Sequence, residues 1–308
     1  MVARQGGDFL TTRINRFTII GAPLDCTGRF TGVERMPAAL RRAGLGNAVT
    51  AADAGDLDIA ISDPHRNPAT GIIGFADLCA ATATIRRAVG DLLRSGQRPL
   101  VLGGCCSLLI GVAAALRDVY GRTGLAFVDG HLDFYDGSSS PTGEAADMEL
   151  AILTGLGPAG LVDIAGAPPL INPADVTVLG FRDEAQAAAN GAPDPRTVAP
   201  KMALYDAETL RRYGCAAAGA GVEERFRFDP GHFWLHLDLD VLDKNELPAV
   251  DYPMPGGLTW TEVAALVRPL AQSPALVGLD VTIYNPTLDP NGEYARQILA
   301  LLQAILDT

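Results

Sequence analysis

The chain has 308 residues, of which 24 are Lys or Arg and 36 are Asp or Glu, giving a formal net charge of −12 at pH 7 with 48% hydrophobic residues. This composition is too apolar for a disordered protein, and the length allows a large buried core. The acidic balance, without clustered Lys or Arg, argues against nucleic acid or an anionic membrane as a partner.

Short apolar runs alternate with longer helical patterns, which is typical of crossover units in a parallel sheet. In chain order, the predicted strands are Phe17–Ala22, Arg98–Leu102, Gly124–Asp129, Val176–Phe181, Met202–Tyr205, Phe233–Leu239 and Leu276–Ile283. The predicted helices are Phe75–Ser95, Ser107–Val119, Thr261–Ala271 and Glu293–Leu306, and Thr259 is the expected N-cap of the third. Two segments rich in Gly, Pro and small polar residues, Asp136–Gly143 and Ala189–Pro200, are expected to be loops. We predict one three-layer α/β/α domain over residues 1–308.

No segment of the sequence predicts export or a membrane span. The N-terminal residues lack the apolar core of a signal peptide. The apolar stretch Ala151–Leu170 is interrupted by Gly155, Pro158 and Asp163, so it does not provide about 20 continuous residues for a bilayer. We therefore expect a cytoplasmic protein. Five cysteines without a Cys-x-x-Cys pair predict neither a disulfide scaffold nor a zinc ribbon.

Two of the predicted strands end in carboxylates at every second position. Asp129, His131 and Asp133 follow one apolar run, and Asp238 and Asp240 lie in another. Alternation would place each set on one face if the segments stay extended. A single Asp at such a place is commonly a surface group or a helix cap. Burying two sets would cost roughly several kcal/mol per carboxylate, so a divalent cation is the simplest compensation. Oxygen ligands with one imidazole favour Mn²⁺ over structural zinc.

Three motifs resemble the signature motifs of the ureohydrolases, the superfamily of arginases and agmatinases. They are Leu102-Gly-Gly-Cys-Cys106-Ser107, Asp129-Gly-His-Leu-Asp133 and His236-Leu-Asp-Leu-Asp240-Val-Leu-Asp243. The segments Gly180-Phe-Arg-Asp183 and Gly278 to Pro286 support the likeness, which covers nearly the whole chain. The resemblance implies a mainly parallel sheet of about eight strands and a small-molecule substrate. It also implies a homo-oligomer, either a trimer or a hexamer.

The resemblance further implies a metal centre. In the family, two Mn²⁺ ions share a hydroxide that attacks a guanidinium or amidine carbon. Carried over to this chain, the second ion would bind Asp129, His131, Asp238 and Asp240, and the first would bind Asp129, Asp133, Asp238 and Cys106. Asp133 and Asp240 would also help to hold the hydroxide, which makes them the expected catalytic residues.

Cys106 stands where the family has a histidine, and a thiolate pairs poorly with Mn²⁺. The chain could therefore hold one ion or two. The first site could be weak, empty, or filled by Zn²⁺, Fe²⁺, Co²⁺ or Ni²⁺. Alternatively, Cys106 is a small buried residue without a ligand role. We expect Cys105 to point elsewhere, and Cys26, Cys79 and Cys215 to be core or incidental thiols. A minority branch of the superfamily, which includes an Nω-hydroxy-arginine hydrolase of D-cycloserine biosynthesis, resembles this chain in the same cysteine and suggests secondary metabolism.

Three further departures from the family pattern argue against arginine as the substrate. Ala146 stands where arginases have a proton-shuttling His, and Ala185 and Ala188 replace carboxylates that receive an α-amino group. Ile283 stands where a Glu pairs with the guanidinium, and burying that cation opposite Ile would be costly. We expect a less cationic group, namely an N-hydroxyguanidine, an amidine or formimidoyl group, or an amide-like bond. The expected substrate-binding residues are Asp136, Ser138, Glu144, Asp183 and Ile283.

The favoured function is a metal-dependent hydrolase of a linear, non-peptide C–N bond, with metal-bound hydroxide as the nucleophile. Two alternatives stay open. The chain could be a non-catalytic binding or partner protein that kept the fold, because three positions of the substrate machinery have changed. The Cys106 thiolate could also be the nucleophile, activated by a nearby cation or by the helix that follows it.

Overall fold

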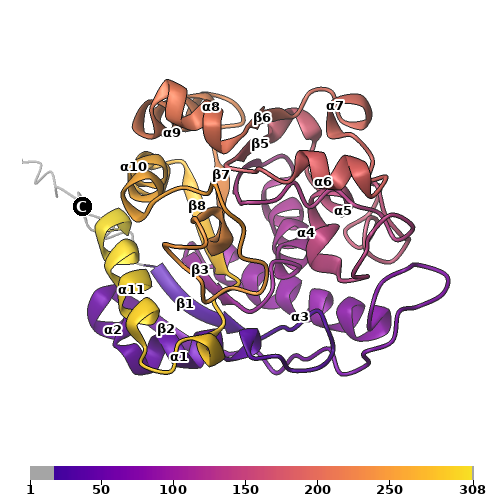
Figure 1. Ribbon diagram of the computed structural model, residues 1–308, viewed down its shortest axis with the longest axis horizontal. Helices are drawn as coiled ribbons and strands as arrows, with labels where there is room; N and C mark the ends of the chain where they lie inside the picture. Colours follow the sequence, from indigo (N-terminus) through magenta and orange to yellow (C-terminus); the bar gives the residue numbers. More distant parts are fainter. Residues whose placement is uncertain (1–16, 307–308) are drawn as a thin grey trace, which may run out of the picture.

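A computed structural model describes residues 17–306 of the chain, and these residues contain eight strands that form one parallel sheet. The strands are β1 (Phe17–Ala22), β2 (Ala51–Asp56), β3 (Arg98–Gly103), β4 (Gly124–Val128), β5 (Val176–Leu179), β6 (Ala203–Tyr205), β7 (Phe233–Asp238) and β8 (Leu276–Thr282). Their order across the sheet is β2-β1-β3-β8-β7-β4-β5-β6 (Figure 1). The predicted α/β fold with a parallel sheet of about eight strands is confirmed.

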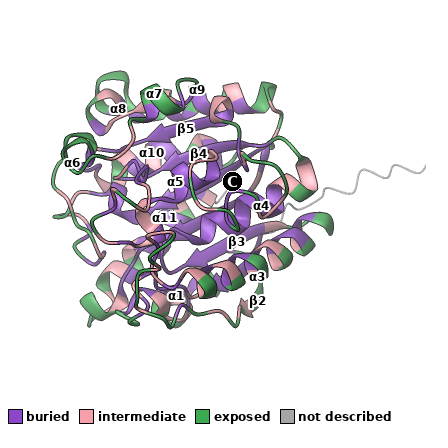
Figure 2. Ribbon diagram, turned by 90° about the vertical axis from the view of Figure 1, so that its right-hand side faces the viewer, coloured by how far each residue is buried: buried purple, intermediate pink, exposed green. Residues whose placement is uncertain are grey.

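Helices cover both faces of the sheet, so the buried strands lie in the interior of the molecule (Figure 2). The helices are α1 (Met36–Ala43), α2 (Leu45–Ala48), α3 (Phe75–Arg94), α4 (Leu108–Tyr120), α5 (Glu149–Leu153), α6 (Glu184–Ala189), α7 (Pro195–Val198), α8 (Ala207–Tyr213), α9 (Cys215–Phe228), α10 (Trp260–Ala271) and α11 (Glu293–Leu306). Helix α4 contacts both α3 and α5, while α9, α10, α11 and α1 form a second series of contacts. Among residues 17–306, no helix is long and apolar enough to cross a membrane.

All of the strands and helices that the sequence predicted are present in the structure. β1 and α11 have the predicted bounds, and the other predicted strands and helices differ by one or two residues at an end. The prediction missed β2, because Ala51–Asp56 is small, polar and largely exposed at the edge of the sheet. The expectation that Ala189–Pro200 is entirely a loop was wrong, since α7 forms within it. There Asp194 caps the helix by accepting the N–H of Arg196.

The start of α10 follows the sequence prediction closely. The Thr259 side chain accepts the N–H of Glu262 at 3.2 Å, and the Glu262 carboxylate accepts the N–H of Thr259 at 2.8 Å. This reciprocal pair satisfies two N–H groups that the first turn of a helix leaves without partners. It fixes the entry of α10 from the loop that follows β7.

The topology brings four strand ends to the middle of one sheet edge. β3, β8, β7 and β4 are consecutive neighbours in the sheet, and their carboxyl ends are followed by the motifs around Cys106, Ile283, Asp238 and Asp129. The turn after β3 packs tightly, because a Cβ at Gly104 would lie 1.7 Å from the carbonyl oxygen of Leu24. Only glycine allows this approach.

Candidate metal centre and active site

Three of the predicted ligands lie together beside β4 and β7. The candidate ligand atoms of Asp129, His131 and Asp240 all lie within 4.8 Å of one another. His131 Nδ1 is 3.0 Å from an Asp240 oxygen and 3.7 Å from an Asp129 oxygen. Asp238 lies at the end of β7, where its carboxylate accepts the N–H of Asp240 and the hydroxyl of Thr282, both at 2.8 Å.

The local backbone differs from the expectation in both segments. β4 ends at Val128, and Asp133 adopts a left-handed conformation with φ 45°, so alternation along an extended strand is the wrong explanation for this cluster. Asp240 lies on a 3₁₀ turn, Leu239–Val241. The carboxylates meet because each segment turns above the carboxyl edge of the sheet. Backbone N–H groups of these turns donate to the carboxylates and hold them in place. One such bond runs from the N–H of His131 to an Asp129 oxygen at 2.6 Å.

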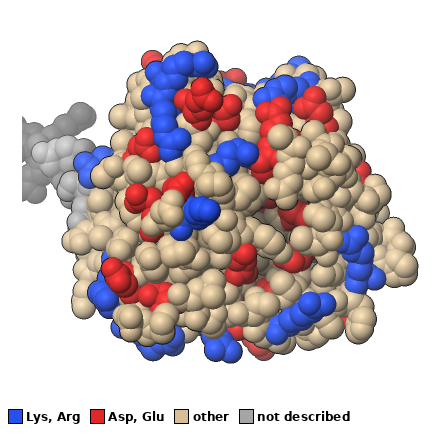
Figure 3. Space-filling view, in the orientation of Figure 1, with Lys and Arg blue, Asp and Glu red and all other residues tan. Residues whose placement is uncertain are grey.

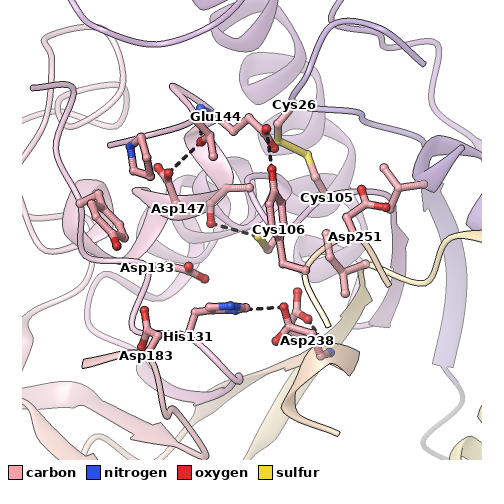
Figure 4. Close-up of a pocket in the computed structure, with 18 of the residues that line it drawn as sticks. Cys26, Cys105, Cys106, His131, Asp133, Glu144, Asp147, Asp183, Asp238 and Asp251 are labelled. Carbon is pink, nitrogen blue, oxygen red and sulfur yellow. Dashed lines mark hydrogen bonds and ion pairs between the residues drawn. A yellow bond between two sulfur atoms is a disulfide. The ribbon is translucent and has the colours of Figure 1, made fainter. Parts of the chain in front are cut away.

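Cys106 lies on the other side of the same space (Figure 4). Its thiol is buried and donates to the carbonyl oxygen of Ala146 at 3.3 Å. The ligand atoms of Cys106, Asp133 and Glu149 lie within 4.8 Å of one another. Burial raises the pKa of the Cys106 thiol well above its usual range, and the nearby Glu149 carboxylate raises it further. The protein's own groups therefore hold Cys106 as a neutral thiol, which disfavours it as a nucleophile.

The neighbouring cysteine is in a disulfide, which the sequence did not predict. Cys105 is bonded to Cys26 (Figure 4), so the expectation that Cys26 is an incidental thiol was wrong. Cys26 follows β1 and Cys105 follows β3, and these two strands are paired in the sheet, which is why residues 79 positions apart meet. Cys26 and Cys105 both line the cavity described below. Cys79 and Cys215 are free.

Two functional candidates, Glu149 and His236, were missed by sequence reasoning. Both side chains are fully buried. His236 stands in one of the three motifs, where the resemblance assigns it no role, and Glu149 is the one charged residue in the apolar run Met148–Leu153. A lone charge in an apolar segment was the available signal, because a buried carboxylate requires a partner.

A cavity opens from this centre to the surface, and several acidic side chains line it. Glu144, Asp183 and Ile283, which were expected to bind substrate, are among the lining residues. Asp136 and Ser138 are not. Instead, the Asp136 carboxylate accepts the hydroxyl of Ser138 at 2.7 Å within their own turn.

Further acidic residues and two tyrosines, Tyr135 and Tyr252, also line this cavity. Asp147 and Asp251 line it, and Tyr252 donates its hydroxyl to the Glu144 carboxylate at 2.9 Å. Figure 3 shows a hollow near the middle of this face, with acidic side chains in and around it. Burial raises the pKa of Glu144 to about 7 and the pKa values of Asp147 and Asp183 to about 6. These three acids therefore lose their protons between pH 5 and 8, and the wall of the cavity becomes more negative as pH rises.

The innermost cluster contains more carboxyl groups than imidazoles. Burial opposes ionisation of Asp129, but the imidazoles of His131 and His236 outweigh it and lower the pKa of Asp129. Burial and the neighbouring Glu149 raise the pKa of Asp133 well above its usual range. One oxygen of Asp129, both oxygens of Glu149 and Nε2 of His236 are buried without a hydrogen-bond partner. These residues suit a divalent cation, because a cation would satisfy each of these acceptors.

Comparison with known proteins places the chain in a family. Residues 15–306 match the model of the arginase family. The chain is 30% identical over 302 residues to the arginase of Bacillus caldovelox, covering 94% of this chain and 97% of that protein. It is 27% identical to the arginase of Brevibacillus brevis, covering 94% of this chain and 96% of that protein.

Solved structures give the same result. The native arginase of Bacillus caldovelox superposes with a TM-score of 0.84 at 27% identity, covering 96% of this chain and 99% of that one. The proclavaminate amidino hydrolase of Streptomyces clavuligerus shares the fold, with a TM-score of 0.70 at 21% identity, covering 95% of this chain and 91% of that one. The chain belongs to the arginase family of the ureohydrolase superfamily.

Proposed function

We propose that this protein is a metal-dependent hydrolase of a linear, non-peptide C–N bond, with manganese as its metal. The observation that carries the proposal is the group of Asp129, His131 and Asp240, whose ligand atoms lie within 4.8 Å of one another. Membership in the arginase family supports hydrolysis of a C–N bond. A bound metal would act as a Lewis acid and lower the pKa of a coordinated water.

The chain's own residues would prepare the site for that chemistry. Asp129, His131, Asp238 and Asp240 would hold the metal, and the hydrogen bonds from Thr282 and from the N–H groups of the turns orient their carboxylates. Asp133 lies beside this group on the cavity side. From this position its carboxyl group could transfer a proton to a leaving nitrogen. The cavity would exclude bulk water from the reacting carbon.

The substrate that we propose is less cationic than arginine. Ile283 lines the cavity, and its backbone has φ 74°, a strained conformation for a β-branched residue. Its N–H donates to the carbonyl oxygen of Gly104 at 2.9 Å, which fixes this position beside the metal centre. An apolar side chain here would face the substrate's C–N group. An N-hydroxyguanidine is less basic than a guanidine and would cost less to bury there, and an amidine or formimidoyl group presents fewer N–H donors that need a partner.

The outer wall supports a polar, partly cationic substrate body. Glu144 and Asp183 would receive amino groups from the substrate, because both line the cavity and both ionise near neutral pH. A role in secondary metabolism and assembly into a trimer or hexamer stay predictions from the family resemblance.

A substrate panel tests the proposal. Protein loaded with Mn²⁺ is assayed for release of product from Nω-hydroxy-L-arginine, a formimidoyl amino acid, a simple amidine and L-arginine. We expect turnover of at least one of the first three compounds at a rate at least about tenfold above that of L-arginine, and loss of turnover in EDTA. No turnover of any compound by protein that holds the metal would favour the non-catalytic alternative. Binding of less than about half an equivalent of any transition metal would overturn the proposal.

A further inference from the structure

We propose that Glu149 and His236 rebuild the first metal site of this chain, together with Asp129. The inference rests on the proposed metal-dependent function and deepens it. It assigns ligands to a cation that the thiol of Cys106 would hold poorly. In this arrangement the second imidazole of the centre comes from β7 instead of the turn after β3.

The first support is a group of buried acceptors without donors. The ligand atoms of Asp129, Glu149 and His236 lie within 4.8 Å of one another, and all three side chains are at most 1% exposed. Oδ2 of Asp129, both oxygens of Glu149 and Nε2 of His236 have no hydrogen-bond partner. Leaving such a group unsatisfied in the interior destabilises the fold, and more so when the group is charged. Unpaired groups gathered at one point indicate a shared ligand, because isolated packing defects would be scattered.

The second support is which nitrogen of the His236 ring carries the hydrogen. The Asp280 carboxylate accepts the indole N–H of Trp234 through one oxygen and faces Nδ1 of His236 through the other, both at 2.5 Å. A carboxylate accepts hydrogen bonds through both of its oxygens, so Nδ1 of His236 is the donor toward Asp280. In the neutral ring, Nε2 then carries a lone pair directed at Asp129 and Glu149. A carboxylate that orients an imidazole in this way is the usual support of a metal-binding histidine.

The third support is the spacing of the acceptors. Nε2 of His236 lies 3.6 Å from Oδ2 of Asp129, which is too long for a hydrogen bond. Two ligands that each lie about 2.0–2.2 Å from one cation can be up to roughly 4 Å apart, so this separation fits two ligands of the same ion. Phe127 stacks on the His236 ring with centroids 4.7 Å apart and fixes its plane.

Glu149 joins this group to the rest of the centre. Its carboxylate is also within 4.8 Å of Cys106 and Asp133. An ion bound by Glu149 would therefore have Asp129 and His236 on one side and Cys106 and Asp133 on the other. Asp129 in turn belongs to the group with His131 and Asp240. The two proposed ions would therefore share Asp129, and Cys106 would be a neighbour of the first ion but not its essential ligand.

A proton is the competing explanation. A doubly protonated His236 could neutralise Asp129, and a proton between Glu149 and Asp133 could neutralise that pair. The centre would then hold one metal, and neither Glu149 nor His236 would affect it. The number of ions bound per chain separates the two explanations.

The test measures Mn²⁺ bound to the full-length protein by elemental analysis after reconstitution and removal of free ions. We expect two ions per chain in the wild type and one in Glu149→Gln and in His236→Asn. The Gln side chain keeps the shape of Glu149, and the Asn amide can still donate to Asp280. Glu208→Gln and His65→Asn make the same chemical changes at exposed positions and should keep two ions.

Electron paramagnetic resonance gives a second readout that needs no variant. Two Mn²⁺ ions that share Asp129 should give a spin-coupled spectrum, and pulsed measurements on the wild type should detect imidazole nitrogens from two histidines. In Glu149→Gln the coupled signal should be replaced by that of an isolated ion. A wild-type signal with coupling to the nitrogen of one histidine would overturn the assignment even if both variants fail to fold.

The outcomes also separate this inference from the proposed function. Two ions retained in both folded variants, or one ion in the wild type with no effect of either variant, would overturn the rebuilt site and leave the proposed hydrolase intact. No metal in the wild type would overturn both. Two ions that fall to one in the variants would support the rebuilt site, whatever the substrate panel shows.

Discussion

At the scale of single residues, Ile283 separates this chain from the arginase pattern most directly. It lines the cavity with 5% of its surface exposed and holds a left-handed backbone at the end of β8. A β-branched residue in that conformation costs about 1–3 kcal/mol. The turn after β3 fixes the position through Gly104, so the side chain has little freedom to turn away. The apolar contact that it offers should therefore determine which C–N group fits.

Replacing this residue tests its role in specificity. Ile283→Glu should raise kcat/KM for L-arginine by at least about tenfold, because a carboxylate beside the guanidinium supplies the missing charge partner. The same change should lower kcat/KM for the less cationic substrates of the panel. Ile283→Gln, which is polar but uncharged, is the control and should not raise turnover of L-arginine. Equal effects of Gln and Glu would contradict a charge-based explanation.

The site residues that stand in recognisable motifs could be predicted from the sequence. Those whose role depends on contacts with other segments could not. Asp129, His131 and Asp240 could be predicted because carboxylates that follow buried strands meet at one sheet edge. Glu149 could not be placed, because nothing in the sequence shows that α5 brings it next to Asp133. His236 lies on a predicted strand, but its role depends on Asp280, which is 44 positions away and on another strand. Contacts between distant segments decided both cases.

At the scale of elements, the disulfide joins the two segments that close the cavity beside β1 and β3. Cys26 and Cys105 are 79 positions apart, so the bond closes a long loop of the unfolded chain. A cross-link stabilises mainly by restricting the unfolded state, and long loops gain more than short ones. Because Cys106 is adjacent, the same bond also holds the backbone of the metal centre.

Removing the disulfide should lower the free energy of unfolding by about 2–4 kcal/mol. The double variant Cys26→Ser, Cys105→Ser is compared with the wild type by urea unfolding at pH 7 in EDTA, so that metal does not contribute. Treatment of the wild type with dithiothreitol should reproduce the loss. Cys79→Ser removes a free thiol and serves as the control. A wild type that dithiothreitol leaves unchanged would mean that the two thiols are not bonded in solution.

At the scale of the whole molecule, the chain has a net charge of −12, and several of its acidic residues are gathered at the carboxyl edge of the sheet. Strand order requires this placement, since β3, β8, β7 and β4 are neighbours and all point the same way. The fold thus gathers carboxyl groups whose burial and mutual repulsion raise their pKa values, so several of them hold protons when no metal is bound. Stability should therefore depend on protons and on metal at the same place.

Stability without metal should fall as pH rises from 5 to 8. In the folded protein Glu144 has a pKa of about 7, and Asp147 and Asp183 have pKa values of about 6. Ordinary carboxyl groups in an unfolded chain titrate near 4. The folded state therefore binds more protons throughout this window, and its stability is lost as these groups ionise. The raised pKa values of His131 and His236 act in the same direction. We expect a loss of at least about 2 kcal/mol by urea unfolding in EDTA.

Mn²⁺ should reverse this trend, because the metal competes with protons for the ligand carboxylates and imidazoles of the centre. With saturating Mn²⁺, stability should rise between pH 5 and 7, so the stabilisation by metal grows with pH. The combined variant Glu144→Gln, Asp147→Asn, Asp183→Asn removes the cavity acids but none of the proposed ligands. It should flatten the profile in EDTA while keeping the response to Mn²⁺. A wild-type profile in EDTA that rises with pH would show that these acids are ionised in the folded protein at pH 5, and that another group balances their charge.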